Sequence, residues 1–343
     1  MISNPKIIIS GVLTGMDYSV KILVPSLFPL MFLSRFIINS QILDFSKKYF
    51  NILTKFLFYL PGSVFPAIIL SMLGGYPIGA ICAQKLLETK EINLEQFNRL
   101  LRFTVNSGPG FIINFLGFSI LKNQVLANII LISQVISSLT IAIISGIISR
   151  IKHEKFYCNY NILNKSTKNL SEIFVETISE TSINIINICF TVIIFNSLIS
   201  VLIFLNIFKN MNNEILFLIQ SFLEITCGIC FLKNNIISPE MISFAVNYAG
   251  LSTHFQIISI LKNTDFNYAN FHIFRIISAI ISVVITVFLT NYFGYYIPTF
   301  ITNTNNINFT HGYNLSIYGS IALCIMCVYY TVSICKNNNT RRK

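Results

Sequence analysis

Long apolar stretches dominate this sequence, and they limit what the chain can fold into more than any other feature. Only 11% of the residues are charged, whereas a soluble domain carries about 25%. A run of about 20 apolar residues crosses a bilayer as one helix. We therefore expect an all-α, polytopic membrane protein with about eight spans. Apolar stretches fall near 6–40, 60–87, 98–120, 124–150, 172–207, 213–232, 236–262, 269–293 and 315–335.

The net charge of +11 comes from Lys and Arg residues that flank the apolar stretches. This placement is typical of membrane topology and of contact with anionic lipids, so we expect lipid partners and no nucleic acid. Basic clusters occur at 47–55, at 150–168 and in the tail at 336–343. The positive-inside rule predicts that they lie on the same, cytoplasmic side.

That prediction conflicts with a simple count of crossings. Three apolar stretches separate the cluster at 47–55 from the one at 150–168, and five separate the latter from the tail. Two points on one side need an even number of crossings, so one stretch in each half should be re-entrant. The candidates are RLLRFTVNSGPGFIINFLG (Arg99–Gly117) and EMISFAVNYAGLSTHFQI (Glu240–Ile257).

The two candidates share the pattern F-x-V-N, at Phe103–Asn106 and at Phe244–Asn247. Each follows another interrupted apolar stretch, GGYPIGA in the first half and EITCGI in the second. Paired interrupted stretches at corresponding positions predict an internal duplication and mark transporter binding sites. We expect a first membrane half at 1–150, a basic loop at 151–171, a second half at 172–335 and a basic tail at 336–343.

The interruptions predict a polar site. Three Gly and one Pro in GGYPIGA would cost a continuous helix roughly 6 kcal/mol. Irregular backbone at membrane depth is tolerated where it is buried in protein or lines a watery cavity. The amino ends of half-helices would favour an anion there. The alternative is close helix packing through small residues.

Glu224 is the most informative single residue, because it lies about ten residues from either end of an apolar stretch. Ionisable residues at such depth mark ion or proton pathways, and desolvation favours their protonated form. The alternative is a protonated Glu that makes a structural hydrogen bond. Neutral polar groups suited to an oriented ligand lie in the two re-entrant candidates: Asn106, Ser107, Asn114, Asn247, Ser252, Thr253, His254 and Gln256. His254 is equally compatible with a buried structural role.

Motifs of enzyme chemistry are absent from the sequence, which contains no P-loop, no H-E-x-x-H and no G-x-S-x-G. The C-x-x-C pairs Cys227/Cys230 and Cys324/Cys327 lie in apolar stretches without a second pair or a His nearby, so we interpret them as helix-face residues. We expect no enzymatic activity, no metal and no cofactor.

Four motifs, GGYPIGA, NSGPGFI, LEITCG and AGLSTHFQ, resemble in that order the set found in the YlbJ (SpoVV) family of sporulation integral membrane proteins. That family belongs to the nucleoside-recognition (Gate-domain) group, which is distantly similar to concentrative nucleoside transporters. The resemblance covers roughly residues 15 to 295, and the later RIISAII segment also fits it.

The resemblance implies a transporter that moves dipicolinic acid, a planar dianion, across the outer forespore membrane of an endospore-forming bacterium. The alternatives are a nucleoside or organic-anion transporter of the same group, and a membrane scaffold for spore assembly that transports nothing. An oligomer is compatible with each. By motif position, the substrate site would comprise Gly74, Gly75, Tyr76, Pro77, Gly79, Asn106, Ser107, Gly108, Pro109, Asn114, Glu224, Thr226, Gly228, Asn247, Ser252, Thr253, His254 and Gln256.

Overall fold

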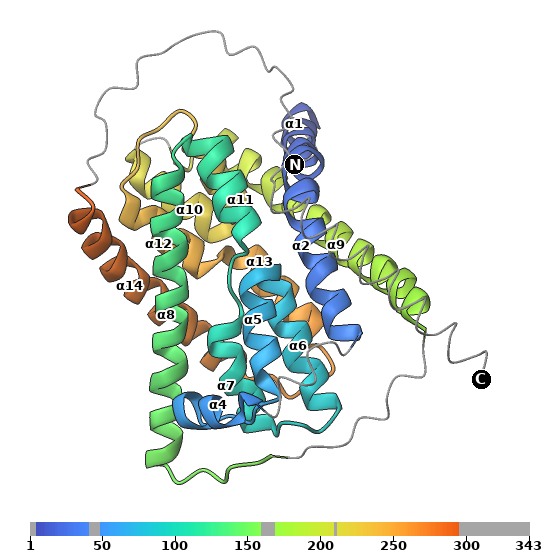
Figure 1. Ribbon diagram of the computed structural model, residues 1–343. Coiled ribbons are helices and arrows are strands. Elements are labelled where there is room, and N and C mark those ends of the chain that lie inside the picture. Colours follow the sequence, from blue (N-terminus) through green and yellow to red (C-terminus); the bar gives the residue numbers. More distant parts are fainter. Residues whose placement is uncertain (1–4, 41–48, 159–168, 209–210, 295–343) are drawn as a thin grey trace. The chain divides into compact units, whose positions relative to one another are not determined.

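The computed structural model describes residues 5–40, 49–158, 169–208 and 211–294 (Figure 1). All regular elements in these ranges are helices, which confirms the predicted all-α class. The first half contains α1 (Pro5–Tyr18), η1 (Ser19–Leu23), α2 (Val24–Asn39), α4 (Asn51–Phe58), α5 (Val64–Gly74), α6 (Tyr76–Glu88), α7 (Leu94–Thr104), η2 (Gly110–Leu121) and α8 (Gln124–Ile151). The second contains α9 (Leu170–Phe204), α10 (Asn213–Leu223), α11 (Ile225–Phe231), α12 (Pro239–Tyr248), α13 (Gly250–Ile260) and α14 (Tyr268–Tyr292). The expected span near 315–335, the basic tail and the Cys324/Cys327 pair lie outside the described residues.

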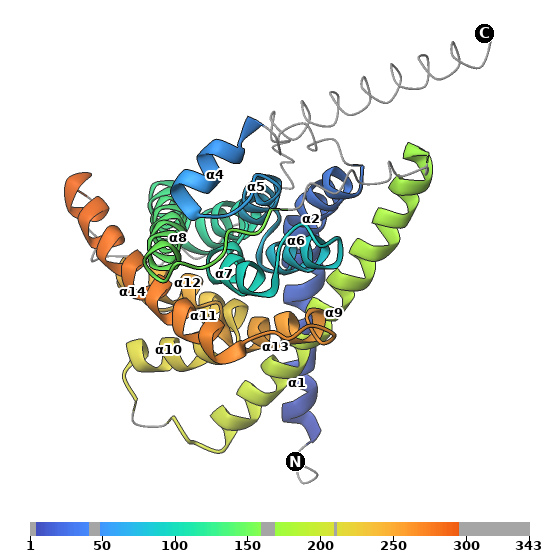
Figure 2. The same ribbon diagram turned by 90° about the horizontal axis from the view of Figure 1, so that it is seen from below.

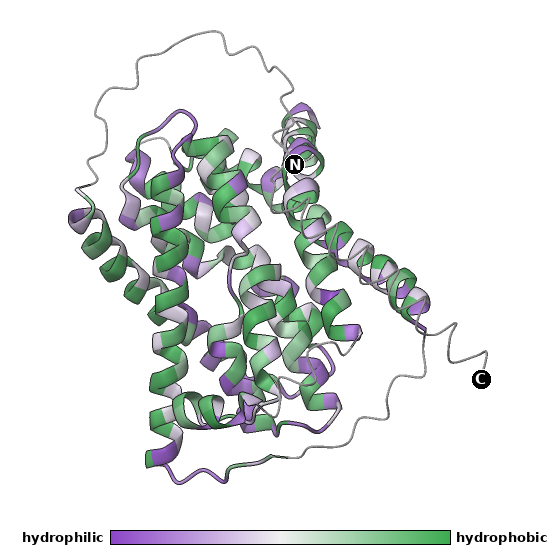
Figure 3. Ribbon diagram, viewed as in Figure 1, coloured by the Kyte–Doolittle hydropathy of each residue, from purple (hydrophilic) through white to green (hydrophobic). Residues whose placement is uncertain are grey.

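Within the described residues, four long helices are apolar enough and long enough to cross a membrane. They are the continuous run α1–η1–α2 with 35 residues, α8 with 28, α9 with 35 and α14 with 25. Exposed apolar side chains occur along them, such as Ile136 on α8, Ile194 on α9 and Val284 on α14. The ribbons of these helices are coloured mostly as hydrophobic in Figure 3. These surfaces suit lipid, and the chain is a polytopic helical membrane protein.

Two of the remaining apolar segments are hairpins of half-helices. In the first hairpin, α5 and α6 lie side by side in both views and turn at Gly75 (Figures 1 and 2). In the second hairpin, α10 and α11 pack so closely that a Cβ at Gly228 would lie 1.9 Å from Ser221 Oγ. Each hairpin therefore enters the helical bundle and returns to the side from which it came.

The other two apolar segments are helices broken in the middle. Between α7 and η2 the chain runs irregularly through 105–109, which we call the first break; α12 and α13 are separated by Ala249, the second break. Figure 1 shows α7 in the lower part of the bundle and its continuation η2 in the upper part. These helices pass through the bundle instead of turning back.

This arrangement corrects the sequence interpretation. One re-entrant segment per half was expected, but the wrong one was chosen: Arg99–Gly117 and Glu240–Ile257 form the broken helices, and the preceding segments form the hairpins. The physical reason is that a hairpin of two short apolar helices has the length and composition of a single span.

Apart from α4, which has no counterpart among the described residues, the order of elements is the same in both halves: a 35-residue helix, a hairpin, a broken helix and a long helix. Figure 1 shows the first hairpin entering from below and the second from above, so the halves run in opposite directions. Asn106 and Asn247, the last residues of the two F-x-V-N patterns, differ by 141 in number (247 − 106 = 141). With the same difference, Ser137 of α8 donates a 2.7 Å hydrogen bond to the carbonyl of Ser278 on α14. Inverted repeats of this kind are common in secondary transporters.

Two of the basic clusters meet at the lower end of the bundle. The Arg150 guanidinium donates to the carbonyls of Lys55 and Phe56, and Tyr59 donates through its hydroxyl to the Glu154 carbonyl at 3.1 Å. The loops near 55 and 150 therefore lie on one side, as the charge pattern predicts. The first hairpin does not cross the membrane. Between the loops near 55 and 150 only the broken helix α7–η2 and α8 cross it, so the number of crossings is even.

Candidate functional site

The tip of the first hairpin is a sharp turn that only glycine accommodates easily. Gly75 has φ +86° and ψ −175°, a region in which a Cβ is strained. The next residue, Tyr76, starts α6 and donates its hydroxyl to the Val246 carbonyl at 2.7 Å, close to the second break. The first hairpin is thereby attached to the broken helix of the other half.

The first break satisfies its backbone through side chains of neighbouring helices. Gln134 of α8 accepts from the Ser107 amide at 3.2 Å and donates to the Ser107 carbonyl at 2.8 Å. Ser138, also on α8, donates to Asn106 Oδ1 at 2.7 Å. From α14, Arg275 Nη1 donates to the Val105 carbonyl at 2.6 Å. These contacts replace the helical hydrogen bonds that the break forgoes, as irregular backbone at membrane depth requires.

Glu224 occupies the tip of the second hairpin. It has extended backbone at the amino end of α11, is 1% exposed, and accepts a 2.6 Å hydrogen bond from the Cys227 amide. Thr226 contributes a further backbone and side-chain hydrogen bond to the same carboxyl group. The buried carboxylate therefore caps the half-helix, which is a favourable place for a negative charge.

The second break depends on two residues with left-handed backbone. Ala249 has φ +78° and Gly250 has φ +70°. Gly250 also packs against the second hairpin, since a Cβ there would lie 2.8 Å from the Ser221 carbonyl. A larger residue at position 250 would separate the break from the hairpin.

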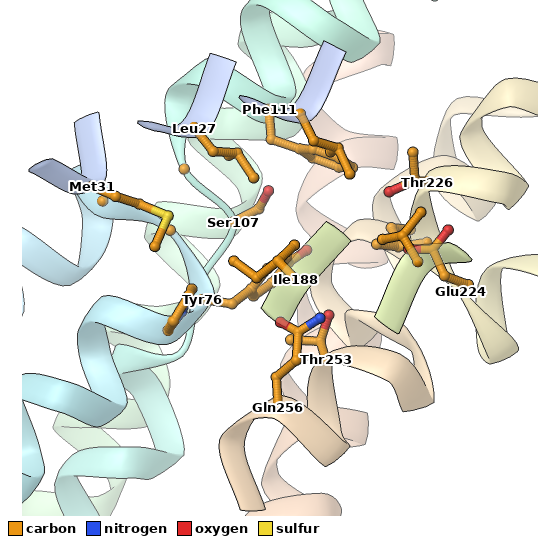
Figure 4. Close-up of a pocket in the computed structure, with 17 residues that line it drawn as sticks. Leu27, Met31, Tyr76, Ser107, Phe111, Ile188, Glu224, Thr226, Thr253 and Gln256 are labelled. Carbon is orange, nitrogen blue, oxygen red and sulfur yellow. The ribbon is translucent and has the colours of Figure 1, made fainter. Parts of the chain in front are cut away.

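The two hairpin tips and the two broken helices surround one cavity of about 40 Å³ (Figure 4). A buried water needs roughly 10–15 Å³ of such space, so the cavity holds a few water molecules. Ten of the residues proposed from sequence line it: Gly74, Gly75, Tyr76, Pro77, Ser107, Gly108, Glu224, Thr226, Thr253 and Gln256. The segments GGYPIGA, NSGPG, LEIT and STHFQ, far apart in the sequence, are brought together here.

Eight proposed residues are not among those that line the cavity: Gly79, Asn106, Pro109, Asn114, Gly228, Asn247, Ser252 and His254. Most are buried beside it and serve packing. Gly79 lies against the Thr104 backbone, and Asn106 faces α8. His254 contacts the Tyr248 carbonyl at 3.2 Å and His272 Nδ1 at 3.4 Å.

Asn114 lies on an exposed face of η2 and does not line the cavity. It was proposed because it is a polar residue in the interrupted stretch Arg99–Gly117. That criterion does not distinguish the face of η2 that points inward from the face that points outward.

Sequence reasoning also missed residues that build the site. Its apolar walls come from α9, from η2 and from the run η1–α2, and include Leu23, Leu27, Met31, Phe111, Ile188 and Val192. Isolated apolar residues in apolar spans carry no sequence signal. Arg275 did carry one, because an Arg inside an otherwise apolar span is unusual. Among the described residues, no group of three or more His, Cys, Asp or Glu side chains could hold a metal ion.

A polytopic helical membrane protein with paired hairpins and broken helices around a central cavity is the class that this geometry defines. The chain is similar to the sporulation integral membrane protein YlbJ of Bacillus subtilis (strain 168), with 21% identity over 313 residues, covering 82% of this chain and 77% of the relative. This similarity confirms the resemblance to the YlbJ family indicated by the four motifs. No family model matches the chain, and no solved structure does.

Proposed function

We propose that the chain is a membrane transporter, not an enzyme, and that it carries dipicolinic acid across the outer forespore membrane of an endospore-forming bacterium. The observation that supports transport most strongly is the convergence of two hairpin tips and two broken helices on one cavity that has both polar and apolar walls. The name of the Bacillus relative supports a role in sporulation. Dipicolinate is the substrate that the family resemblance implies.

An anionic substrate agrees with the electrostatics of the half-helices. The amino ends of α6, η2 and α13 lie at the hairpin tip or the breaks, and none has a side-chain cap. Free amide groups and the helix dipole favour negative charge at such ends. At the amino end of α11, the Glu224 carboxylate already fills this role.

The closed cavity and the inverted hairpins suggest how access alternates. A cavity of about 40 Å³ is far smaller than the 300–1,000 Å³ typical of ligand pockets, so substrate entry requires the tips to separate. Because the hairpins enter from opposite sides, withdrawal of one would open the cavity to one side only (Figure 1). Glu224 at the second tip would then exchange its contact with the Cys227 amide for an ion, a proton or water.

Uptake of labelled dipicolinate into liposomes containing the purified protein tests the proposal. We expect saturable uptake that excess nucleoside does not block, and loss of uptake in Glu224→Gln. The matched control is Asn114→Ala, an exposed position outside the cavity, which should retain uptake. Competition by nucleosides would identify a nucleoside carrier instead. Folded protein without uptake of either compound under any imposed gradient would favour a scaffold.

A further inference from the structure

Arg275 of α14 is fully buried but only partly satisfied. Its exposed fraction is 0%, and Nη1 donates to the Val105 carbonyl at 2.6 Å. Nε and Nη2 have no hydrogen-bond partner, and none of the ion pairs found among the described residues includes Arg275. A guanidinium stays charged in proteins, and a buried charge without a partner is costly. Such a group is retained where a ligand supplies the missing partner.

The unpartnered atoms are on one edge of the guanidinium. Nε–H and one Nη2–H point in parallel, and this edge matches the two oxygens of a carboxylate through a bidentate pair of charge-assisted hydrogen bonds. A single carbonyl oxygen can accept from both donors, but it carries no charge and leaves the guanidinium without a counterion. The chemistry of the free edge therefore selects a carboxylate over a neutral ligand.

The surroundings of Arg275 connect it to the cavity. Val105, which it contacts, directly precedes Asn106–Gly108, and Ser107 and Gly108 line the cavity. Tyr76, a lining residue at the first hairpin tip, lies near enough to interact with the Arg275 charge. Ser107 Oγ is also buried, and it lies beside the Tyr76 hydroxyl. A shift of the Tyr76 tip would bring the free edge and the Ser107 hydroxyl into one enlarged site.

The contact with Val105 does not account for the charge of Arg275. Gln134 of α8, whose number differs from that of Arg275 by 141 (275 − 134 = 141), binds the amide and the carbonyl of Ser107 within its own half and has no charge. Arg275 crosses from the second half to the Val105 carbonyl. A backbone carbonyl accepts equally from a neutral donor, so the positive charge at position 275 needs a further explanation.

We propose that Arg275 is the carboxylate-binding residue of the transport site, and that the substrates are small organic acids held through the Nε/Nη2 edge. This inference rests on the proposed transport function and names the residue that would hold a carboxylate of the substrate. One carboxylate pairs with Arg275, and a second carboxylate, where present, meets the uncapped amino end of a half-helix. Neutral nucleosides would leave the buried charge unpaired.

The first test uses the unmodified protein in liposomes. Pyridine-2,6-dicarboxamide has the shape of dipicolinate without its charge. The concentration of this diamide that inhibits uptake of labelled dipicolinate should be roughly tenfold or more above that of unlabelled dipicolinate, because charge-assisted hydrogen bonds are lost. Picolinate, with one carboxylate, should inhibit at an intermediate concentration. Equal inhibition by the diamide would overturn the proposal without requiring any variant to fold.

The second test separates binding from structure. Arg275→Gln keeps a donor for the Val105 carbonyl and should raise the KM for dipicolinate roughly 10- to 100-fold. If the diamide is transported, its KM should change less. Arg275→Lys keeps the positive charge and should restore part of the affinity for dipicolinate. A purely structural role predicts a lower Tm with equal effects on all compounds. An unchanged KM in folded Arg275→Gln would overturn the inference while leaving dipicolinate transport intact. Absence of dipicolinate uptake in the unmodified protein would instead refute the proposed function, and this inference with it.

Discussion

Replacement of Gly75 by Ala perturbs the first hairpin tip without filling the cavity. With φ +86° and ψ −175°, Gly75 adopts backbone that is essentially restricted to glycine, and a side chain there costs about 1–3 kcal/mol. A Cβ at this position would lie 3.4 Å from the Gly108 amide nitrogen and 3.8 Å from its Cα, which are ordinary contacts. The cost is therefore conformational, and the tip relieves it by changing its turn.

Gly75→Ala should lower the Tm of the purified protein and also impair transport. For domains of 150–250 residues, 1 kcal/mol shifts Tm by about 2–4 °C, so a cost of about 1–3 kcal/mol predicts a decrease of roughly 2–12 °C. Since Gly75 lines the cavity and precedes Tyr76, the altered turn should also displace the Tyr76 hydroxyl from the Val246 carbonyl. The uptake rate should fall by more than the loss of folded protein explains.

The matched control is Gly294→Ala, which also has positive φ, at +62°, but no atom within 4 Å of the added Cβ. It should lose about 1–2 kcal/mol of stability and keep normal uptake per folded molecule. Equal Tm and equal uptake for Gly75→Ala and the unmodified protein would refute the assigned tip geometry. Equal transport defects in both variants would refute the link between the tip and the site.

Three further substitutions test the supports of the site and of the lower face by thermal unfolding. Gln134→Leu leaves the buried amide and carbonyl of Ser107 unpaired and should cost about 2–4 kcal/mol; a change below 1 kcal/mol would contradict the assigned hydrogen bonds. Ala249→Gly removes a Cβ from left-handed backbone and should be neutral or stabilise by up to about 1 kcal/mol, so marked destabilisation would count against the second break. Glu154→Gln deprives buried Arg99 of its 3.1 Å ion pair and should cost about 1–3 kcal/mol, given that Glu154 is partly exposed; an unchanged Tm would contradict the pairing.

The sequence predicted the class of fold because the bilayer imposes length and hydropathy on each span. It also predicted one re-entrant segment in each half, since counting crossings between basic clusters constrains their number. It could not identify the segment. VFPAIILSMLGGYPIGAICA contains enough apolar residues for one span, and the turn at Gly75 becomes visible only when α6 is seen packed against α5.

The polar residues of the cavity could be predicted from the sequence where they lie at interruptions of apolar helices. Gly75, Ser107 and Glu224 were identified because each breaks or charges an apolar segment. The exposed side chain of Asn114 shows the limit of this reasoning, because a polar residue in an interrupted stretch can also lie on the outward face of its helix. Arg275 carried a local signal, as an Arg inside an apolar span, but its contact with Val105, 170 residues away, could not be predicted from the sequence.

The accessibility of the cavity from each side of the membrane tests most directly whether the cavity is an alternating-access transport site. In a functional variant whose eight native cysteines are replaced, Thr226→Cys and Thr253→Cys place a thiol on the second hairpin and on α13, both lining the cavity. Ser145→Cys, buried on α8 outside the cavity, is the control. If this is an alternating-access site, a membrane-impermeant thiol reagent will label both lining positions from either face of the membrane. Dipicolinate will slow this labelling, and position 145 will remain unlabelled. Labelling of the lining positions from one face only, or from neither, would contradict the account.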